Sequence, residues 1–371
     1  MNMIELHILQ SFPVTCLNRD DVGAPKSARF GGVQRARVSS QSWKRAIREL
    51  AATDDSAKAH FAGQRTRFVV KALREAYSAK GADEAKADAL AQVTADALGK
   101  LDNLESGSVK TLLFFSRQEL GAVVDAVWEL GLDEATLSEA VGEDKKKAEK
   151  ASKALAKPLA KAAKNLGKAV KDAADIAIFG RMVADDASLT LEGAGLFSHA
   201  LSTHAVSNEL DFFSAVDDAK KDADDAGAGH IGTIEYNSAC YYRYVGVNLD
   251  LLFSASHLQH FSSDKRQAVL TAFLRAAIMA VPSARKNSMF GFTPPFYILG
   301  LRRAGQPISL VNAFERAVPA GGDGYAAASQ TALQAHWQHL KSLYSLDVQA
   351  AVELPPENLD QLLTALTGSP A

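Results

Sequence analysis

The amino-acid sequence predicts an α+β fold whose sheet-containing part is interrupted by a long helical insertion. Apolar and polar residues alternate at the amino terminus, and β-rich segments return between residues 175 and 299. Between them, residues 51–175 are rich in Ala, Lys, Glu and Leu, which favours helices. With 371 residues, of which 47% are hydrophobic, the chain can bury a sizeable core in about two or three domains.

The first strand and the first helix are predicted from their hydrophobic periods. Ile4, Leu6 and Ile8 alternate with polar residues, as in a half-buried strand, and Pro13 closes this run. From Ser40 to Leu50, apolar side chains recur at helical spacing after a serine that can cap the helix. We expect Ser39 or Ser40 at the N-cap.

The later elements complete a recognisable order. We expect a helix from about Ser263 or Asp264 to Pro282, and an exposed excursion over Glu209–Gly229. The three later strands are predicted at Asp175–Gly180, Glu235–Phe253 and Phe296–Leu299. Without the insertion and the excursion, the order is strand, helix, strand, strand, helix, strand. This is the ferredoxin-like order, which RRM domains share.

Composition narrows the class of protein. The formal net charge is −2, so any site for a polyanion must be local. Cys16 and Cys240 are the only cysteines and have no metal-ligand or redox spacing. The amino terminus lacks the features of a signal peptide, and no apolar run is long enough to span a bilayer. We expect a cytoplasmic protein without a cofactor.

Positive charge is concentrated between Arg29 and Arg48. This segment has six basic residues and no acidic one, which leaves 35 of the 41 Lys and Arg against all 43 Asp and Glu elsewhere. A strand over 33–39 would direct Arg35 and Arg37 to the same face. A helix from Ser40 would carry its cations on the side opposite its apolar residues. The cationic side comprises Gln41, Lys44, Arg45 and Arg48, and the packing side comprises Trp43, Ile47 and Leu50.

The junction between this strand and helix suits an anion. The free amides and the dipole at a helix amino end favour phosphate, and serine hydroxyls at residues 39–42 add donors. Gly31 and Gly32 permit positive φ or a close backbone approach. A solvated basic helix with an ordinary serine cap is the plainer alternative. Because strand, cap and helix direct donors toward one strip, we favour a nucleic-acid backbone site.

Several motifs resemble, in the same order, those of the CasC backbone subunits of type I-E CRISPR Cascade complexes. The motifs are Cys16–Asp21, Phe30–Gly32, Arg35–Arg45, Asp175–Met182, Thr203–His204, Phe213–Asp218 and Tyr242–Tyr244. The resemblance implies a hand-shaped subunit. It places an RRM-like palm at residues 1–50, 176–203 and 236–330, helical fingers at 51–175, a β-hairpin thumb at 204–235, and a helical tail that packs on the palm at 331–371.

The resemblance also implies a function and partners. The chain would be a non-catalytic crRNA-binding subunit of a ribonucleoprotein for antiviral defence. Its partners would be the crRNA, a target DNA strand paired with the guide, further copies of itself in a helical filament, and other Cascade subunits. The implied RNA-binding residues are Arg19, Arg35, Arg37, Ser40, Gln41, Lys44, Arg45, Arg48, Arg181 and Met182, with Met182 as a wedge between bases. The thumb residues near the displaced base would be His204, Phe212, Phe213, Val216 and Ile231.

Three alternatives remain open on the sequence. Asp20 and Asp21 could supply carboxylates to a metal ion for RNA cleavage, although turn formation or pairing with arginine is more usual for such acids. A scaffold that binds only proteins would leave the basic strip without a purpose. Tyr242 and Tyr244 share one strand face and could stack bases, but we favour a core role. No metal site is expected from the His257/His260 or His336/His339 pairs, which lack a third ligand.

The lysine stripe Lys153–Lys171 has three- and four-residue spacing, interrupted by Pro158. A solvated helix face is the favoured interpretation, and a contact with target duplex is the alternative.

Overall fold

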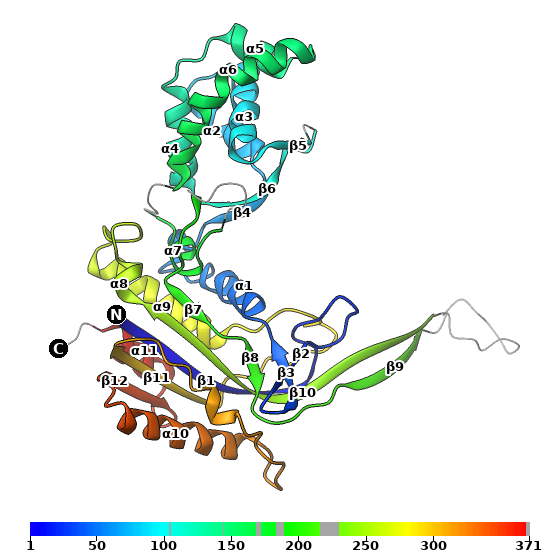
Figure 1. The fold of residues 1–371 in the computed structure, drawn as a ribbon, viewed down its shortest axis with the longest axis vertical. Helices are drawn as coiled ribbons and strands as arrows, with labels where there is room; N and C mark the ends of the chain where they lie inside the picture. The colour runs from blue at the N-terminus through cyan, green and yellow to red at the C-terminus, as the bar shows by residue number, and fades with distance from the viewer. Residues whose placement is uncertain (104, 143, 168–171, 183–188, 216–229, 369–371) are drawn as a thin grey trace, which may run out of the picture. The chain divides into compact units, whose positions relative to one another are not determined.

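The computed structural model describes residues 1–103, 105–142, 144–167, 172–182, 189–215 and 230–368. The chain forms two compact units, coloured by residue number in Figure 1. The sheet unit contains Met1–Asp54, Leu196–Leu249 and Leu270–Ala371. The helical unit contains Asp55–Gly195 and Asp250–Val269. Residues 176–195, which we placed in the palm, therefore belong to the helical unit. The division into palm, fingers and thumb stays a prediction.

Nine strands of the described residues form one sheet, in the order β12-β11-β1-β10-β8-β3-β2, with β7 and β9 also paired to β10. The central strand β1 is antiparallel to both β10 and β11. The strands are β1 (Asn2–Thr15), β2 (Ser27–Phe30), β3 (Val33–Val38), β7 (Gly195–Phe197), β8 (Ala200–Ser202), β9 (Glu209–Ala215), β10 (His230–Asn248), β11 (Tyr297–Ala304) and β12 (Val348–Leu354).

The predicted first strand is confirmed, but it is buried on both faces. Glu5 and His7, which alternation placed toward solvent, are inaccessible. Glu5 forms an ion pair with Arg303, and Nδ1 of His7 lies 2.9 Å from the hydroxyl of Tyr242. The strand also continues past Pro13, where the register to β10 shifts and no ladder donor is needed. Polar residues can occupy this central strand because side chains from distant elements pair with them.

Helices cover both faces of this sheet. They are α1 (Ser40–Ala51), the carboxyl-terminal part of α9 (Ser263–Met279), α10 (Ala326–Leu343) and α11 (Leu359–Thr367), with a short 3₁₀ turn at Val311–Phe314. On one face, Tyr242, Tyr244 and Leu299 pack with Leu333 and Trp337 of α10. This confirms the core role of the two tyrosines, since both rings are covered.

The other face carries α1 and α9. The guanidinium of Arg243 lies 4.3 Å from the centre of the Trp43 ring and donates to the carbonyls of Ala277 and Ile278. The helices predicted at 40–50 and from residue 263 are thus confirmed. The predicted helical tail also contains a strand, because β12 pairs with β11 before α11 begins.

The predicted second strand is wrong. Residues Ala174–Phe179 form a helix, α7, in the helical unit. In a six-residue, mainly apolar run, the period cannot distinguish a strand from a buried helix, and all but the last of these residues are buried. The place beside β10 is taken by β8. The third strand ends at Asn248, where α8 (Leu249–Leu252) begins, and the fourth, β11, is confirmed and longer than predicted.

The helical unit contains the expected helices and a small sheet that we did not predict. The helices are α2 (Val70–Ala79), α3 (Glu84–Gly99), α4 (Arg117–Trp128), α5 (Glu134–Val141) and α6 (Lys145–Ala163), with 3₁₀ turns at Lys58–His60 and Lys164–Gly167. The sheet has the order β4 (Gln64–Phe68), β6 (Ser108–Phe115) and β5 (Leu101–Asn103). Leu73, Leu90, Val123 and Leu159 join helices in one core. None of the described helices is both long and apolar enough to cross a membrane.

Candidate nucleic-acid interface

The junction of β3 and α1 has the predicted serine cap. Ser39 has extended backbone, and its hydroxyl accepts from the amide of Ser42 at 3.4 Å. The amide of Ser39 donates to Oδ1 of Asn18 at 2.9 Å, and that of Ser40 donates to Nδ1 of His199 at 3.1 Å. These first-turn amides, which we assigned to a phosphate, already have partners within the protein. Contacts to an anion therefore fall mainly on side chains.

His199 is a site residue that the sequence did not reveal. Burial lowers the pKa of its ring, and the positive charges of Arg37 and Lys26 lower it further. A neutral ring can accept the amide of Ser40 at Nδ1, as the hydrogen bond requires. His199 is 159 positions from Ser40 in the chain, so no local pattern could have paired them.

The two sides of α1 differ as predicted, with one exception. Trp43 and Ile47 are 2% and 0% exposed, whereas Leu50, expected on the same side, is 38% exposed because it lies in the last turn of the helix. Gln41 and Arg45 are exposed. Nε of Arg45 pairs with Glu49 at 2.8 Å, which partly neutralises this end of the strip.

Lys44 and Arg48 are half-buried on the same helix. The ammonium of Lys44 lies 5.1 Å from the centre of the Phe197 ring, and burial lowers the pKa of this lysine. A cation that is already partly dehydrated loses less hydration when it meets a phosphate. Lys44 is therefore well placed for charge-assisted contact with an anion.

Arg19 and Arg37 extend the strip beyond the helix. Arg19 is exposed, and its backbone bridges to Pro25. Arg37 is half-buried, and its Nε donates to the carbonyl of Ser27 at 3.2 Å. Together with the polar and basic residues of α1, they form a surface that we call the α1 strip. Its residues are Arg19, Arg37, Ser40, Gln41, Lys44, Arg45 and Arg48.

Arg35 is not part of this strip, which corrects the prediction. Its side chain is fully buried and donates to the carbonyls of Ser202 at 2.9 Å and Phe314 at 2.8 Å. Alternation along β3 gave its direction, but a segment about 280 residues away covers that direction. The carbonyl of Glu315 also approaches Gly31 so closely that no Cβ would fit there. Gly31 thus allows the close approach of a protein backbone, while Gly32 has open space beside it.

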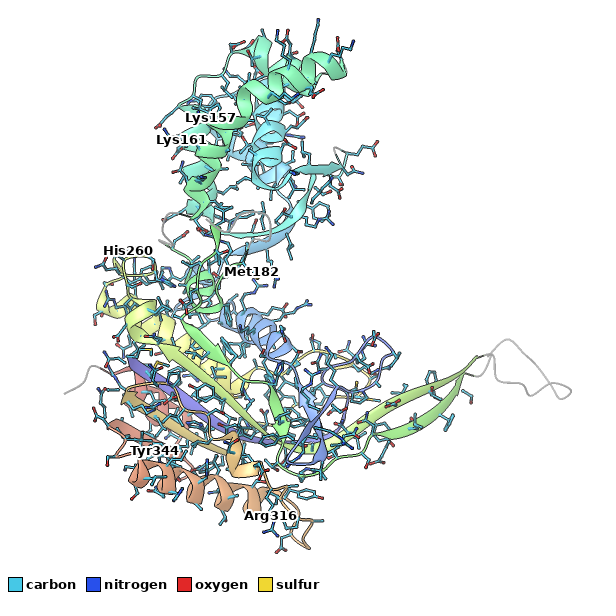
Figure 2. The ribbon with its side chains drawn as sticks, viewed as in Figure 1. Lys157, Lys161, Met182, His260, Arg316 and Tyr344 are labelled. Carbon is cyan, nitrogen blue, oxygen red and sulfur yellow. The ribbon has the colours of Figure 1, made fainter. Side chains whose placement is uncertain are left out.

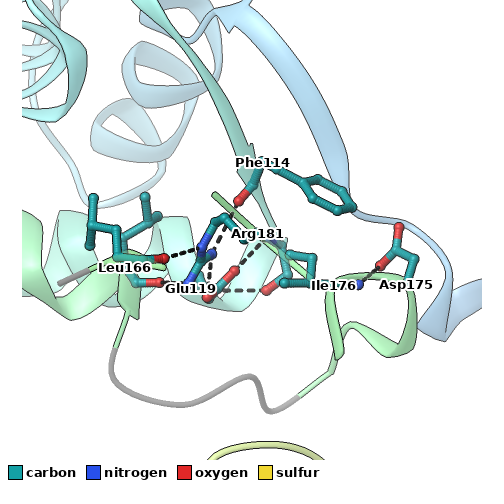
Figure 3. A network of polar contacts seen from close by, with 8 residues as sticks. Phe114, Glu119, Leu166, Asp175, Ile176 and Arg181 are labelled. Carbon is teal, nitrogen blue, oxygen red and sulfur yellow. Dashed lines mark hydrogen bonds and ion pairs between the residues drawn. The ribbon is translucent and has the colours of Figure 1, made fainter. Parts of the chain in front are cut away.

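Arg181 is likewise structural, contrary to the prediction. Figure 3 shows its guanidinium buried within the helical unit, paired with Glu119 at 2.8 Å. It also donates to the carbonyls of Phe114, Leu166 and Leu189 at 2.8–3.1 Å. These four partners use the donors that a phosphate would need. The adjacent Met182, labelled in Figure 2, is 85% exposed, as a wedging side chain requires.

A β-hairpin is present where the thumb was expected. β9 and β10 pair from Glu209↔Tyr236 to Ala215↔His230 and extend as a two-stranded ribbon (Figure 1). Phe212 is 72% exposed and Phe213 40%. Val216 lies outside the described residues, and so does the side chain of Ile231, whose backbone pairs with Ser214.

His204 is buried at the base of this hairpin, so its predicted place among the base-displacing residues is wrong. Its Nε2 accepts from the amide of Cys240 at 3.1 Å, and its Nδ1 lies 3.0 Å from the carbonyl of Ala205. The ring stacks on Tyr325 with 3.5 Å between ring centres. Burial lowers the pKa of His204, and a neutral ring with its proton on Nδ1 fits both hydrogen bonds.

The acidic candidates do not form a metal centre. Oδ1 of Asp20 accepts from the amides of Val22 at 3.1 Å and Ala24 at 2.8 Å, which is a turn-forming role. Within the described part of the chain, no group of three or more His, Cys, Asp and Glu side chains could hold a metal ion.

Lys153, Lys157 and Lys161 of the lysine stripe lie on α6, which continues through Pro158, and Lys164 lies in the 3₁₀ turn that follows. Lys153 pairs with Glu149 at 2.7 Å, and Lys157 and Lys161 are exposed (Figure 2). Lys168 and Lys171 lie outside the described residues. Leu155 and Leu159 are buried, so α6 has a solvated face and a core face.

Comparisons with known proteins agree with the resemblance at a coarser level. The chain is similar to a chain of a structure described as "CRISPR RNA-guided surveillance complex, pre-nicking", with 29% identity, a TM-score of 0.75, and coverage of 93% of this chain and 90% of that chain. A chain of a second "CRISPR RNA-guided surveillance complex" has 25% identity, a TM-score of 0.57, and coverage of 97% and 92%. A search of curated proteins gave no significant match. The model of the CT1975-like protein family matches residues 4–365. The chain therefore belongs to the CT1975-like protein family.

Proposed function

We propose that this protein is a guide-RNA-binding backbone subunit of a type I-E CRISPR RNA-guided surveillance complex. The observation that carries the proposal is the α1 strip, in a chain similar over nearly its whole length to chains of such complexes. Its cations, hydroxyl and amide come from one loop, one strand and one helix of the same unit. They suit the regularly spaced phosphates of a backbone and carry no base-reading pattern.

We assign the phosphate contacts from the charges and hydrogen-bond donors that the side chains of the α1 strip present. Lys44 and Arg48 are the inner cations, supported by the packed side of α1. Ser40 and Gln41 lie at the helix amino end and provide neutral donors beside the positive end of the dipole. Arg19 and Arg37 then contact the neighbouring phosphates. Affinity from such contacts depends little on sequence, as a subunit that accepts any guide requires.

The sheet unit supports an RRM-like palm. Its central order, β11-β1-β10-β8, is antiparallel at every pairing. Counted along the chain, that is the 4-1-3-2 order of a ferredoxin-like sheet, with α1 and α9 as its helices. The palm does not bind RNA on its sheet face, because Tyr242 and Tyr244 are covered by α10. The binding strip lies instead at the amino end of α1.

The hairpin and Met182 fit contacts with bases. Exposed Phe212 and Phe213, with Leu210 at 60% exposure, give the hairpin an apolar surface that costs free energy in water. A displaced base would cover part of that surface. Met182 is a flexible apolar side chain that can fill the gap at an unstacked step.

We further propose that the protein does not cleave RNA. The carboxylate of Asp20 is bonded to two amides of its own turn, and its neighbour Asp21 is exposed beside it. Two adjacent carboxylates in one turn seldom converge on a single ion. Several copies would stack along one guide in the cytoplasm, other subunits would complete the complex, and the guide would pair with a target DNA strand between displaced bases.

The test is to purify the protein when it is expressed from its own operon. We expect it to carry RNA of one discrete length together with other subunits. That RNA should stay intact with added Mg²⁺ or Mn²⁺, and the change of Asp20 and Asp21 to Ala should leave its length unaltered. Free monomer without RNA would favour a protein-only scaffold, and metal-dependent cleavage that disappears in the double variant would favour a nuclease.

A further inference from the structure

A second cationic segment lies between α9 and β11. Its residues 280–296 contain Arg285 and Lys286 and no Asp or Glu. Within this stretch, residues 283–292 form a turn that we call the aromatic turn. It carries Arg285 and Lys286 and presents Phe290 and Phe292, which are 76% and 44% exposed. Large exposed rings beside cations call for an explanation, because each exposed ring costs free energy in water.

The aromatic turn is held in place by β1. Nε2 of Gln10 donates to the carbonyl of Thr293 at 2.6 Å, and the hydroxyl of Thr293 donates to the carbonyl of Ser11 at 2.5 Å. Gly291 packs so closely on Thr15 that no Cβ would fit. The amide of Met289 closes the turn on the carbonyl of Arg285 at 2.8 Å. The exposed rings are therefore carried by a fixed backbone.

The aromatic turn packs on the chain segment 15–19, which also carries Arg19 of the α1 strip. Burial raises the pKa of the Cys16 thiol, and the positive charges of Arg285 in the turn and Arg19 in the strip both oppose that rise. Asn18, two residues on, accepts from the amide of Ser39 at the cap of α1. The turn therefore packs on Thr15 through Gly291, and three residues further along the chain Asn18 bonds to the amino end of α1.

We propose that the aromatic turn is a second RNA contact of this subunit, in which Arg285 and Lys286 bind a phosphate and Phe290 stacks on a base. The proposal rests on the proposed function and extends it. Single-stranded nucleic acids are held by cations along the backbone and aromatic rings on the bases. A purely protein partner would need to supply acids for two cations and an apolar pocket for a ring. Packing of the turn on the segment that carries Arg19 of the α1 strip favours RNA.

The main experiment uses the full-length chain and a fluorescently labelled single-stranded RNA of mixed sequence. Phe290→Leu keeps an apolar side chain but removes the stacking face, and we expect roughly 5- to 150-fold weaker binding. Tyr344→Leu is the matched control, because Tyr344 is an exposed ring of the same unit at the end of α10 (Figure 2). The affinity of the Tyr344→Leu variant for RNA should equal that of the wild type.

A second measurement separates charge from stacking. Arg285→Ala combined with Lys286→Ala should reduce the slope of log affinity against log salt by roughly 0.7 for each phosphate that is no longer neutralised. Lys341→Ala, an exposed cation on α10, should leave the slope unchanged. In Phe290→Trp, the new indole should be quenched when RNA is added. Trp43 and Trp337 are only 2% and 3% exposed, and Trp128 is half-buried in the helical unit, so the change seen in the wild-type protein is subtracted as the background.

The outcomes distinguish the two proposals. If the wild type does not bind RNA, both fail. If Lys44→Ala with Arg48→Ala weakens binding but every change in the aromatic turn leaves affinity, salt slope and fluorescence unaltered, the α1 strip stands and the aromatic turn is excluded. Loss of self-association with unchanged RNA binding would assign the turn to another copy of the chain and also overturn this inference.

Discussion

At the scale of single residues, burial distinguishes the arginines that are candidates for binding RNA from those that stabilise the fold. Arg19 and Arg45 are exposed, whereas Arg35 and Arg181 are buried and saturated by carbonyl and carboxylate oxygens. The local sequence gives these side chains the same appearance. Arg35 was predicted with Arg37 because strand neighbours two apart share a face, and only the covering segment at 314–315 separates them.

The cations of the α1 strip provide the first prediction. Lys44→Ala combined with Arg48→Ala should lower the slope of log affinity against log salt by about 1.4, or about 0.7 for each phosphate contact with a single strand. The measurement is RNA binding by the full chain from low to moderate salt. Arg275→Ala is a suitable control, because that cation pairs with Asp360 on α11. An unaltered slope in the double variant would exclude these two residues as phosphate ligands.

Buried histidines provide the second prediction. Burial first, and then the charge of Arg303, lowers the pKa of His7 to about 3. The unfolded chain takes up a proton near pH 6.5, while the native chain does so only near pH 3. The contribution of neutral His7 to the free energy of unfolding is therefore fully present above pH 6.5 and is lost as the pH falls. Between pH 7 and pH 5, the free energy of unfolding should decrease by about 2 kcal/mol because of His7 alone.

Denaturant titrations at the two pH values measure this loss. His7→Asn keeps a polar group near the hydroxyl of Tyr242 but cannot titrate, so its stability should change about 2 kcal/mol less between pH 7 and pH 5. An equal pH dependence in both proteins would show that His7 is not the responsible group.

At the scale of elements, the sequence predicted α1, β1 and α9 from their hydrophobic periods, and β11 from a short apolar run. It failed at α7, where a short, mainly apolar run fits either a strand or a buried helix. Asp175 at that helix accepts from the amide of Gly63 at 3.1 Å, a partner 112 residues earlier. The small sheet of the helical unit was missed because helix-favouring residues surround its short strands.

The third prediction concerns the way Arg181 links elements of the helical unit. It connects β6, α4 and the segments at Leu166 and Leu189. Arg181→Met should cost about 3–5 kcal/mol of unfolding free energy, because Glu119 would be left buried without a counter-charge. Burial already raises the pKa of Glu119 despite the arginine, so the variant should also be more sensitive to rising pH.

Thermal or denaturant unfolding checks this cost. Arg45→Ala, which removes an exposed pair with Glu49, should change stability by no more than about 1 kcal/mol. Arg181→Met with Glu119→Leu should recover part of the loss. An Arg181 variant with native stability and reduced RNA binding would return this residue to the ligand set.

At the scale of the whole molecule, the two units have separate cores and are joined by several crossings of the chain. The α1 strip, the aromatic turn and the hairpin are all in the sheet unit, while Met182 and the lysines of α6 are in the helical unit. The RNA contacts that we propose are therefore divided between the two units.

The fourth prediction follows from the proposed stacking of copies. On RNAs of increasing length, the mass of the complex should rise in steps of one chain, which native mass spectrometry or mass photometry can resolve. Phe212→Ser on the hairpin should reduce the number of steps if the hairpin contacts the next copy. A mass that remains at one chain on every RNA would contradict a filament.

The sequence by itself determined the α+β class, the capped basic helix, the hairpin region and the resemblance to Cascade backbone subunits. These depend on local periods, turn residues and short motifs. Only the tertiary structure decided that Arg35, Arg181 and His204 are buried, that His199 bonds to the cap of α1, and that β8 lies beside β10. Each of these depends on partners far away in the chain, and burial by such partners determines whether a charge binds a ligand or holds the fold together.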